Sequence, residues 1–309
     1  MTCRYPGLGL IARMLLFSTV LQALSGLPVS LAKPASEHHT ENKLHVADRD
    51  FDVYGLPTRQ LEGLLRQRQT LKVRAIISQI PRHPNDDDTR ATWLAACLSA
   101  EGKDEESLAE FGKVKHPEKA NSYALYWVAR AYCQEQSFAR AEELASLGIA
   151  RGDCSECFEV RAACYESEKR YIDAAADYES LANCKKRYAT DFHCKAALAL
   201  LKANQPAKAM ALIDKVYASE KGELSVTLLL AKGKCLESLG RYDEAIVFFS
   251  KAMKAPARKV PTEADFLRTS LLNERLKCFE KLGRKADAAA DRAALEKISR
   301  GLSDDLLGK

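Results

Sequence analysis

The sequence has few of the residues that break helices: its 309 positions include only 15 glycines and 10 prolines. Alanine, leucine, lysine and glutamate are frequent instead, and these residues favour helices. The net charge is only +5, and we find no cluster of basic residues of the kind that nucleic-acid-binding proteins show. The composition therefore predicts a helical protein without a nucleic-acid partner.

Catalytic sequence motifs are also missing. No glycine-rich phosphate loop, His-Glu-x-x-His or Gly-x-Ser-x-Gly sequence occurs. None of the six histidines has an evident serine or cysteine nucleophile as a partner. Acidic pairs such as Glu105–Glu106 fall at predicted helix starts, where negative charge stabilises the helix dipole. We therefore predict that the protein is not an enzyme and that it uses no cofactor and no metal.

The apolar run near the N-terminus, Met14–Leu24, is too short to cross a bilayer as a helix, which takes roughly 20 residues. Ser30 and Ala32 follow it with the small-x-small pattern that signal peptidase recognises. We predict that residues 1–32 are a signal peptide cut after Ala32, and that the mature chain has no transmembrane span and is periplasmic or secreted. An uncleaved anchor or a misplaced start codon is the alternative. The polar residues 33–55 are predicted to be a flexible lead-in.

A repeated pattern of small residues runs along the rest of the chain. The chain can be aligned in a frame of successive repeat units whose positions are numbered 1 to 34. Position 20 of the unit is occupied by Ala75, Ser107, Ala141, Ala174, Ala209, Ala245 and Ala288. Position 8 is occupied by Gly63, Ala95, Ala129, Ala162, Ala197, Gly233 and Leu276. Large residues follow at positions 11 and 24, as with Leu236 and Phe249. Two antiparallel helices can approach closely where a small residue of one faces a large residue of the other. The pattern therefore predicts helix pairs that stack to bury their remaining faces.

These residues resemble the tetratricopeptide repeat, and the resemblance runs from about residue 56 to 300, with a close match at 226–259. It implies an all-α fold, an α-solenoid of about six to seven stacked helix-turn-helix repeats in a right-handed superhelix. Leu276 and Arg292 depart from the small and aromatic residues expected in the last unit, which suggests a capping role for its helices. Residues 301–309 are predicted to be a C-terminal tail. An unrelated all-helical bundle is the alternative.

The resemblance also implies a function, because the first helices of stacked units line a concave groove that binds proteins or peptides. Residues predicted to face this groove are Tyr123, Tyr126, Arg130, Glu159, Glu166, Lys234, Asn273 and Lys277. Tyrosine and arginine often dominate binding energy, so we predict Tyr123, Tyr126 and Arg130 as anchors. Some family members hold a terminal carboxylate with lysine and asparagine at positions 5 and 9, and that clamp is absent here. The prediction is a non-catalytic binding scaffold of the cell envelope or secreted space; ordinary solvated helix faces are the alternative. The oligomeric state stays open.

Nine cysteines follow Cys3. Four of them occupy position 10 and are predicted to be core residues: Cys97, Cys164, Cys235 and Cys278. Four others are predicted to share one rim of the repeats: Cys154, Cys157, Cys184 and Cys194. This second group could form one or two disulfides, stay reduced or bind zinc, and its pairing does not follow from sequence. A thiol/disulfide or metal-handling protein is therefore the alternative function. The remaining Cys133 is predicted to stay free or to pair between chains.

Overall fold

The structure is a computed structural model that describes residues 58–79, 87–152, 155–222, 224–255 and 261–306. Contacts within the chain divide it into two compact units. The larger unit, Val46–Pro256 with Arg268–Lys309, contains every described helix except the first residues of α14. The predicted signal peptide and lead-in lie outside the described residues.

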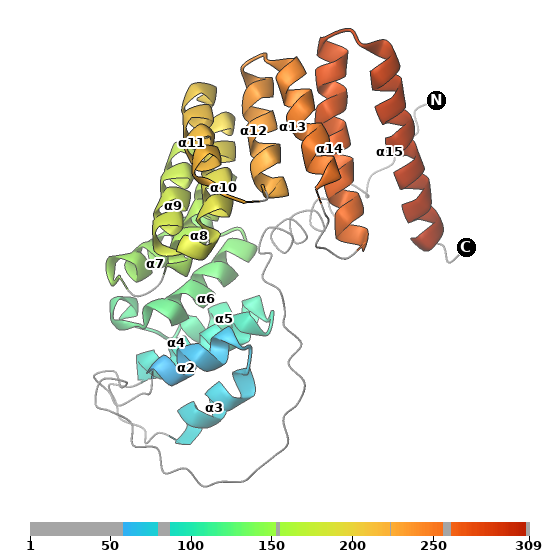
Figure 1. The fold of residues 1–309 in the computed structure, drawn as a ribbon. Coiled ribbons are helices and arrows are strands. Elements are labelled where there is room, and N and C mark those ends of the chain that lie inside the picture. The colour runs from blue at the N-terminus through green and yellow to red at the C-terminus, as the bar shows by residue number, and fades with distance from the viewer. Residues whose placement is uncertain (1–57, 80–86, 153–154, 223, 256–260, 307–309) are drawn as a thin grey trace, which may run out of the picture. The chain divides into compact units, whose positions relative to one another are not determined.

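The described residues form only helices, which follow one another as seven pairs (Figure 1). The pairs are α2 (Thr58–Arg66) with α3 (Thr70–Gln79), α4 (Asp87–Ala100) with α5 (Asp104–Phe111), α6 (Ser122–Gln134) with α7 (Phe138–Ala150), α8 (Glu156–Ser167) with α9 (Tyr171–Cys184), α10 (Ala189–Lys202) with α11 (Pro206–Ser219), α12 (Val226–Ser238) with α13 (Tyr242–Lys254), and α14 (Pro261–Lys281) with α15 (Lys285–Leu306). Two short 3-10 helices, η1 (Pro117–Lys119) and η2 (Lys186–Tyr188), precede α6 and α10.

From α2 to α13, each helix packs on the one before it, and first helices of neighbouring pairs also meet, as α4 does with α6 and α6 with α8. The predicted all-α repeat architecture is confirmed. Helix α15 continues to Leu306, beyond residue 300, where the repeat domain was predicted to end.

The bend inside each pair contains one residue with a positive φ angle. In six pairs this residue lies seven positions after frame position 8: Gly102, Gln136, Lys169, Asn204, Gly240 and Gly283. A left-handed residue ends a helix by redirecting the chain, and glycine adopts this conformation without a steric cost. The recurrence explains why the helix pairs keep a constant internal spacing.

The first pair corrects the predicted frame. Its left-handed residue is Arg68, with a φ of 55°, two positions earlier than in the other pairs. As a result Val73 is fully buried, whereas Ala75, the predicted small contact residue, is exposed. Gly63 likewise meets nothing within 4 Å, and Leu61 takes the buried place two positions before it. The frame is therefore wrong by two residues in α2 and α3.

In the other pairs the small residues are buried as predicted. Helices α12 and α13 approach closely at one such residue, where a Cβ added to Gly233 would stand 2.4 Å from Cε1 of Phe249. Phe249 is itself fully buried, so only glycine fits opposite its ring. The four cysteines at position 10 are also fully buried, as predicted.

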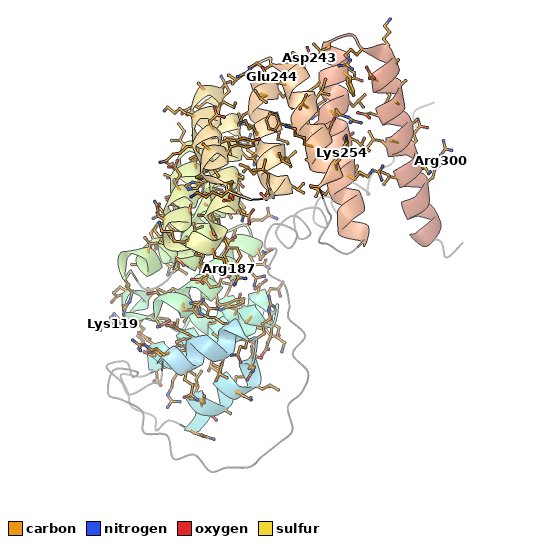
Figure 2. The ribbon with its side chains drawn as sticks, in the orientation of Figure 1. Lys119, Arg187, Asp243, Glu244, Lys254 and Arg300 are labelled. Atoms are coloured by element: carbon orange, nitrogen blue, oxygen red, sulfur yellow. The ribbon has the colours of Figure 1, made fainter. Side chains whose placement is uncertain are left out.

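Some helix ends are stabilised by a side-chain cap or by charges, as α6 and α13 illustrate. The Asn121 side chain accepts hydrogen bonds from the backbone of Tyr123 and Ala124 and thereby begins α6. In α13, Asp243 and Glu244 lie in the first turn and Lys254 in the last (Figure 2). Negative charge near the start of a helix and positive charge near its end both interact favourably with the helix dipole.

Two buried ion pairs repeat the same geometry in different units. Arg161 of α8 donates two hydrogen bonds to Asp177 of α9, at 2.8 and 2.7 Å, and a third to Ser146 of α7. Arg275 of α14 binds Asp291 and Ser250 in the same way. Each arginine thus ties the two helices of its own pair to the second helix of the preceding pair.

Candidate protein-binding site

Three aromatic side chains gather on α6, where the predicted anchors lie. Tyr123 and Tyr126 stack with ring centroids 5.6 Å apart, and Trp127 packs edge-on at 5.2 Å from Tyr126 and 6.4 Å from Tyr123. Residues three and four apart lie on the same side of a helix, and the Asn121 cap sets where this helix begins. The sequence analysis selected the two tyrosines but overlooked Trp127.

Tyr123 is less available than predicted. It is only 5% exposed, and the guanidinium of Arg66 lies 4.3 Å from its ring centroid. Arg66 in turn is paired with Glu156 of α8 at 2.6 Å, and Lys185 binds the same carboxylate at 3.2 Å. Although burial acts to raise the pKa of Glu156, Lys185 and Arg66 outweigh it and hold that pKa at about 2. Tyr123 is therefore part of the packed support of the site.

Tyr126 and Arg130 remain partly exposed on the surface of α6. Burial raises the pKa of Tyr126 above its ordinary value, so the phenol stays protonated at neutral pH. The Arg130 guanidinium lies 5.2 Å from the ring centroid of Trp127, and none of the described carboxylates is paired with it. These two side chains offer an aromatic surface and a positive charge next to each other.

The other predicted groove residues lie on α8, α12 and α14, and most of them bind neighbouring units. Glu159 is paired with Lys195 of α10 at 3.1 Å, and Glu166 with Lys202 at 3.0 Å. Lys234 of α12 and Lys277 of α14 share Glu274, and Asn273 is exposed on α14. The pairs of Glu159, Glu166 and Lys234 join first helices of neighbouring helix pairs, so these three residues have a structural role besides any contact with a partner. The pair of Lys277 with Glu274 lies within α14.

The predicted cysteine cluster is only partly covered, because Cys154 lies outside the described residues. Cys184 is exposed and Cys194 buried, and both are free thiols. Cys157 is buried and donates to the backbone oxygen of Ser122 at 3.6 Å. In the part of the chain that the structure describes, no group of three or more histidine, cysteine or acidic side chains could hold a metal ion. A disulfide involving Cys154 stays a prediction.

A different pair of thiols does meet. Cys133 of α6 and Cys164 of α8 lie close enough to influence each other, which lowers the pKa of Cys133 and, together with burial, raises that of Cys164. The sequence frame placed these two residues at different positions of their units. Their proximity arises because α6 and α8 pack side by side.

The burial of the thiols leads to a prediction about alkylation. Native protein treated with N-ethylmaleimide is expected to react at exposed Cys184 and to leave Cys97, Cys235 and Cys278 unmodified, as peptide mapping by mass spectrometry would show. These three thiols are fully buried, and burial raises the pKa of each to about 12. At pH 8 only about one in 10⁴ of such groups is the reactive thiolate. Unfolding in urea serves as the control, and equal labelling of Cys97 and Cys184 before unfolding would contradict the expectation.

None of the described helices is long and apolar enough to span a membrane.

Comparison with protein-family models gives no match, and comparison with curated proteins gives none either. Solved structures do resemble the chain. One is the C-terminal part of a TPR repeat-containing protein from Cytophaga hutchinsonii, which is 10% identical, with 78% of this chain and 94% of that chain covered and a TM-score of 0.54. Another is pilF of Pseudomonas aeruginosa, 13% identical, with 70% and 94% covered and a TM-score of 0.48.

A chain of the Naa15/Naa10 complex bound to HypK-THB is 16% identical, with 77% of this chain covered and a TM-score of 0.46. This protein spans only 36% of that longer chain. At such identities the likeness concerns the fold alone.

Proposed function

We propose that this chain, which has the fold of the tetratricopeptide repeat proteins, is a non-catalytic scaffold that binds a protein or peptide partner at Tyr126 and Arg130. The observation that carries the proposal is that these two side chains stay partly exposed while Tyr123 and Trp127 beneath them are packed. A preorganised aromatic and cationic surface is typical of the residues that dominate binding energy, because little side-chain entropy is lost on binding.

The proposal is tested by removing both side chains. The double variant Tyr126→Ala, Arg130→Ala is expected to lose most of the partner that the wild-type chain retains after crosslinking and pull-down from extracts of its own cells. The matched control is Tyr188→Ala, Arg187→Ala, because Arg187 also lies over a tyrosine ring, at 5.7 Å, but belongs to η2 (Figure 2). Circular dichroism checks that each variant keeps its helices. Equal retention by the wild type and the α6 variant would reject the site.

We further propose that the partner lies along a concave groove formed by the first helices, with Glu159, Glu166, Lys234, Asn273 and Lys277 around it. The ion pairs of Glu159 and Glu166 with α10 support a preformed surface. The signal-like segment 1–32 supports export to the periplasm or secreted space. N-terminal sequencing of the chain from its own cells tests the export proposal, and a chain that still begins at Met1 would contradict it.

A further inference from the structure

A pair of arginines surrounds Trp127 from two different parts of the chain. Arg130 comes from the next turn of α6 and lies 5.2 Å from the indole centroid. Arg68 comes from the bend between α2 and α3 and lies 5.8 Å from the same centroid. The Arg68 side chain is held there by a hydrogen bond of 3.2 Å to the backbone oxygen of Ala100, at the end of α4. Three helix pairs thus position two positive charges around one ring.

Neither of these arginines forms an ion pair with a carboxylate of the described residues, and this distinguishes Trp127 from other rings. Three further rings in the described part of the chain are each contacted by two cations: Tyr165, Phe248 and Phe279. At each of these rings at least one of the two cations forms an ion pair with an aspartate or glutamate. This cation is Arg161 at Tyr165, Lys232 at Phe248 and Arg275 at Phe279. Around Trp127, by contrast, none of the described carboxylates pairs with either of the two arginines.

Two like charges around one ring repel each other, and the repulsion is stronger beside a buried side chain than in water. Trp127 is only 5% exposed, and its indole N–H has no hydrogen-bond partner among the described residues. Arg68 is exposed and Arg130 half-exposed, so both guanidinium groups can be reached from solvent. A carboxylate that reached both groups would accept charge-assisted hydrogen bonds from them.

We propose that Arg68, Trp127 and Arg130 form a subsite for the carboxylate of an aspartate or glutamate in an acidic protein segment. This inference rests on the proposed function, because it names the chemistry of the partner that Tyr126 and Arg130 bind. The acidic segment contacts Tyr126 with an apolar part of its side chain and the two guanidinium groups with its oxygens.

A nucleic acid fits the surroundings less well. Glu156 and Glu159 lie close enough to Tyr126 to raise its pKa, beyond the effect of burial. A continuous row of phosphates would meet these carboxylates, whereas a peptide can present one carboxylate and neutral groups beside it. The formal net charge of the 309 residues is only +5, which gives little overall attraction for a polyanion.

The test uses an array of peptides in which every peptide with aspartate or glutamate is accompanied by its asparagine or glutamine twin. The wild-type chain is expected to bind the best acidic members at least about tenfold more tightly than their amide twins, because a hydrogen bond between two charged groups is stronger than one to a neutral amide. Arg68→Gln and Arg130→Gln are each expected to remove most of this preference. Arg187→Gln, which alters an arginine over the Tyr188 ring, is expected to retain it.

Fluorescence gives a second readout. In a Trp93→Phe background Trp127 is the only remaining tryptophan of the chain, and a bound acidic peptide is expected to change its emission in proportion to occupancy. The amide twin at the same concentration is expected to leave the emission unchanged. Circular dichroism of each variant separates loss of binding from loss of folding.

Several outcomes would overturn the subsite. They are equal binding of acidic and amide twins, absence of any bound peptide, a preference that survives both arginine variants, and tighter binding of a single-stranded oligonucleotide than of any peptide. If partner capture depends on Tyr126 and Arg130 while the twins bind equally, the subsite is rejected and the proposed function stands. If the wild type captures no partner and binds no peptide, both are rejected.

Discussion

Replacing Arg161 with methionine is expected to lower the free energy of unfolding by about 3–5 kcal/mol, the usual cost of leaving a buried charge without its partner. Asp177 is only 4% exposed, and its two oxygens are bound by Arg161 alone among the described side chains. Methionine keeps most of the length of arginine but offers no donor. The measurement is a urea titration of the wild type and the variant, followed by circular dichroism.

The matched control is Arg241→Met. Arg241 also binds a carboxylate through two hydrogen bonds, both of 2.7 Å to Glu244, but both partners are exposed. Water solvates the freed carboxylate, so no measurable change in the urea midpoint is expected. A double variant, Arg161→Met with Asp177→Leu, is expected to recover most of the loss, because it leaves no buried charge. A small effect of Arg161→Met alone would mean that Asp177 reaches water more readily than its burial indicates.

Replacing Gly233 with alanine is expected to destabilise the fold by about 2 kcal/mol in the same titration. The new Cβ would stand 2.4 Å from Cε1 and 2.7 Å from Cδ1 of Phe249, whose ring is fully buried. Overpacking of this kind costs about 1–3 kcal/mol or more. Alanine also favours the helix over glycine by about 1 kcal/mol. The expected net loss of about 2 kcal/mol therefore corresponds to a steric cost at the upper end of that range.

Gly63→Ala provides the comparison, because Gly63 is also helical but meets nothing within 4 Å. At Gly63 the only effect is the higher helix propensity of alanine, so the free energy of unfolding is expected to rise by up to about 1 kcal/mol. Adding Phe249→Leu to Gly233→Ala is expected to relieve part of the strain. A stabilising effect of Gly233→Ala would show that the two helices can separate without loss, contrary to the close contact described above.

Much of the fold could be predicted because its signals are local and periodic. The small residues at positions 8 and 20 and the large residue at position 24 recur at nearly constant intervals, as Gly233, Ala245 and Phe249 illustrate. The error in the first pair has a physical cause: the chain bends there at Arg68, two positions earlier than in the other pairs, so an assumed constant spacing misplaces the residues around the bend. The buried side, with Val73 in place of Ala75, follows from that bend.

Much less of the candidate site could be predicted. Tyr126 and Arg130 were found from their helical spacing, but the same reasoning gave no sign that Arg66 covers Tyr123 or that Lys195 binds Glu159. Each of these contacts joins residues from different repeat units. Their partners depend on how neighbouring units stack, which a single unit's sequence does not specify.

The sequence by itself determined that this protein consists of stacked helix pairs, because side-chain size at regular spacing decides where two helices can approach. Only the tertiary structure decided which charges are neutralised and which remain available. Asp177 receives its arginine from the other helix of its own pair, whereas Arg68 and Arg130, far apart in the chain, both lie near Trp127 and pair with none of the described carboxylates. Electrostatic partners are set by distances across packed helices, and those distances exist only once the chain has folded.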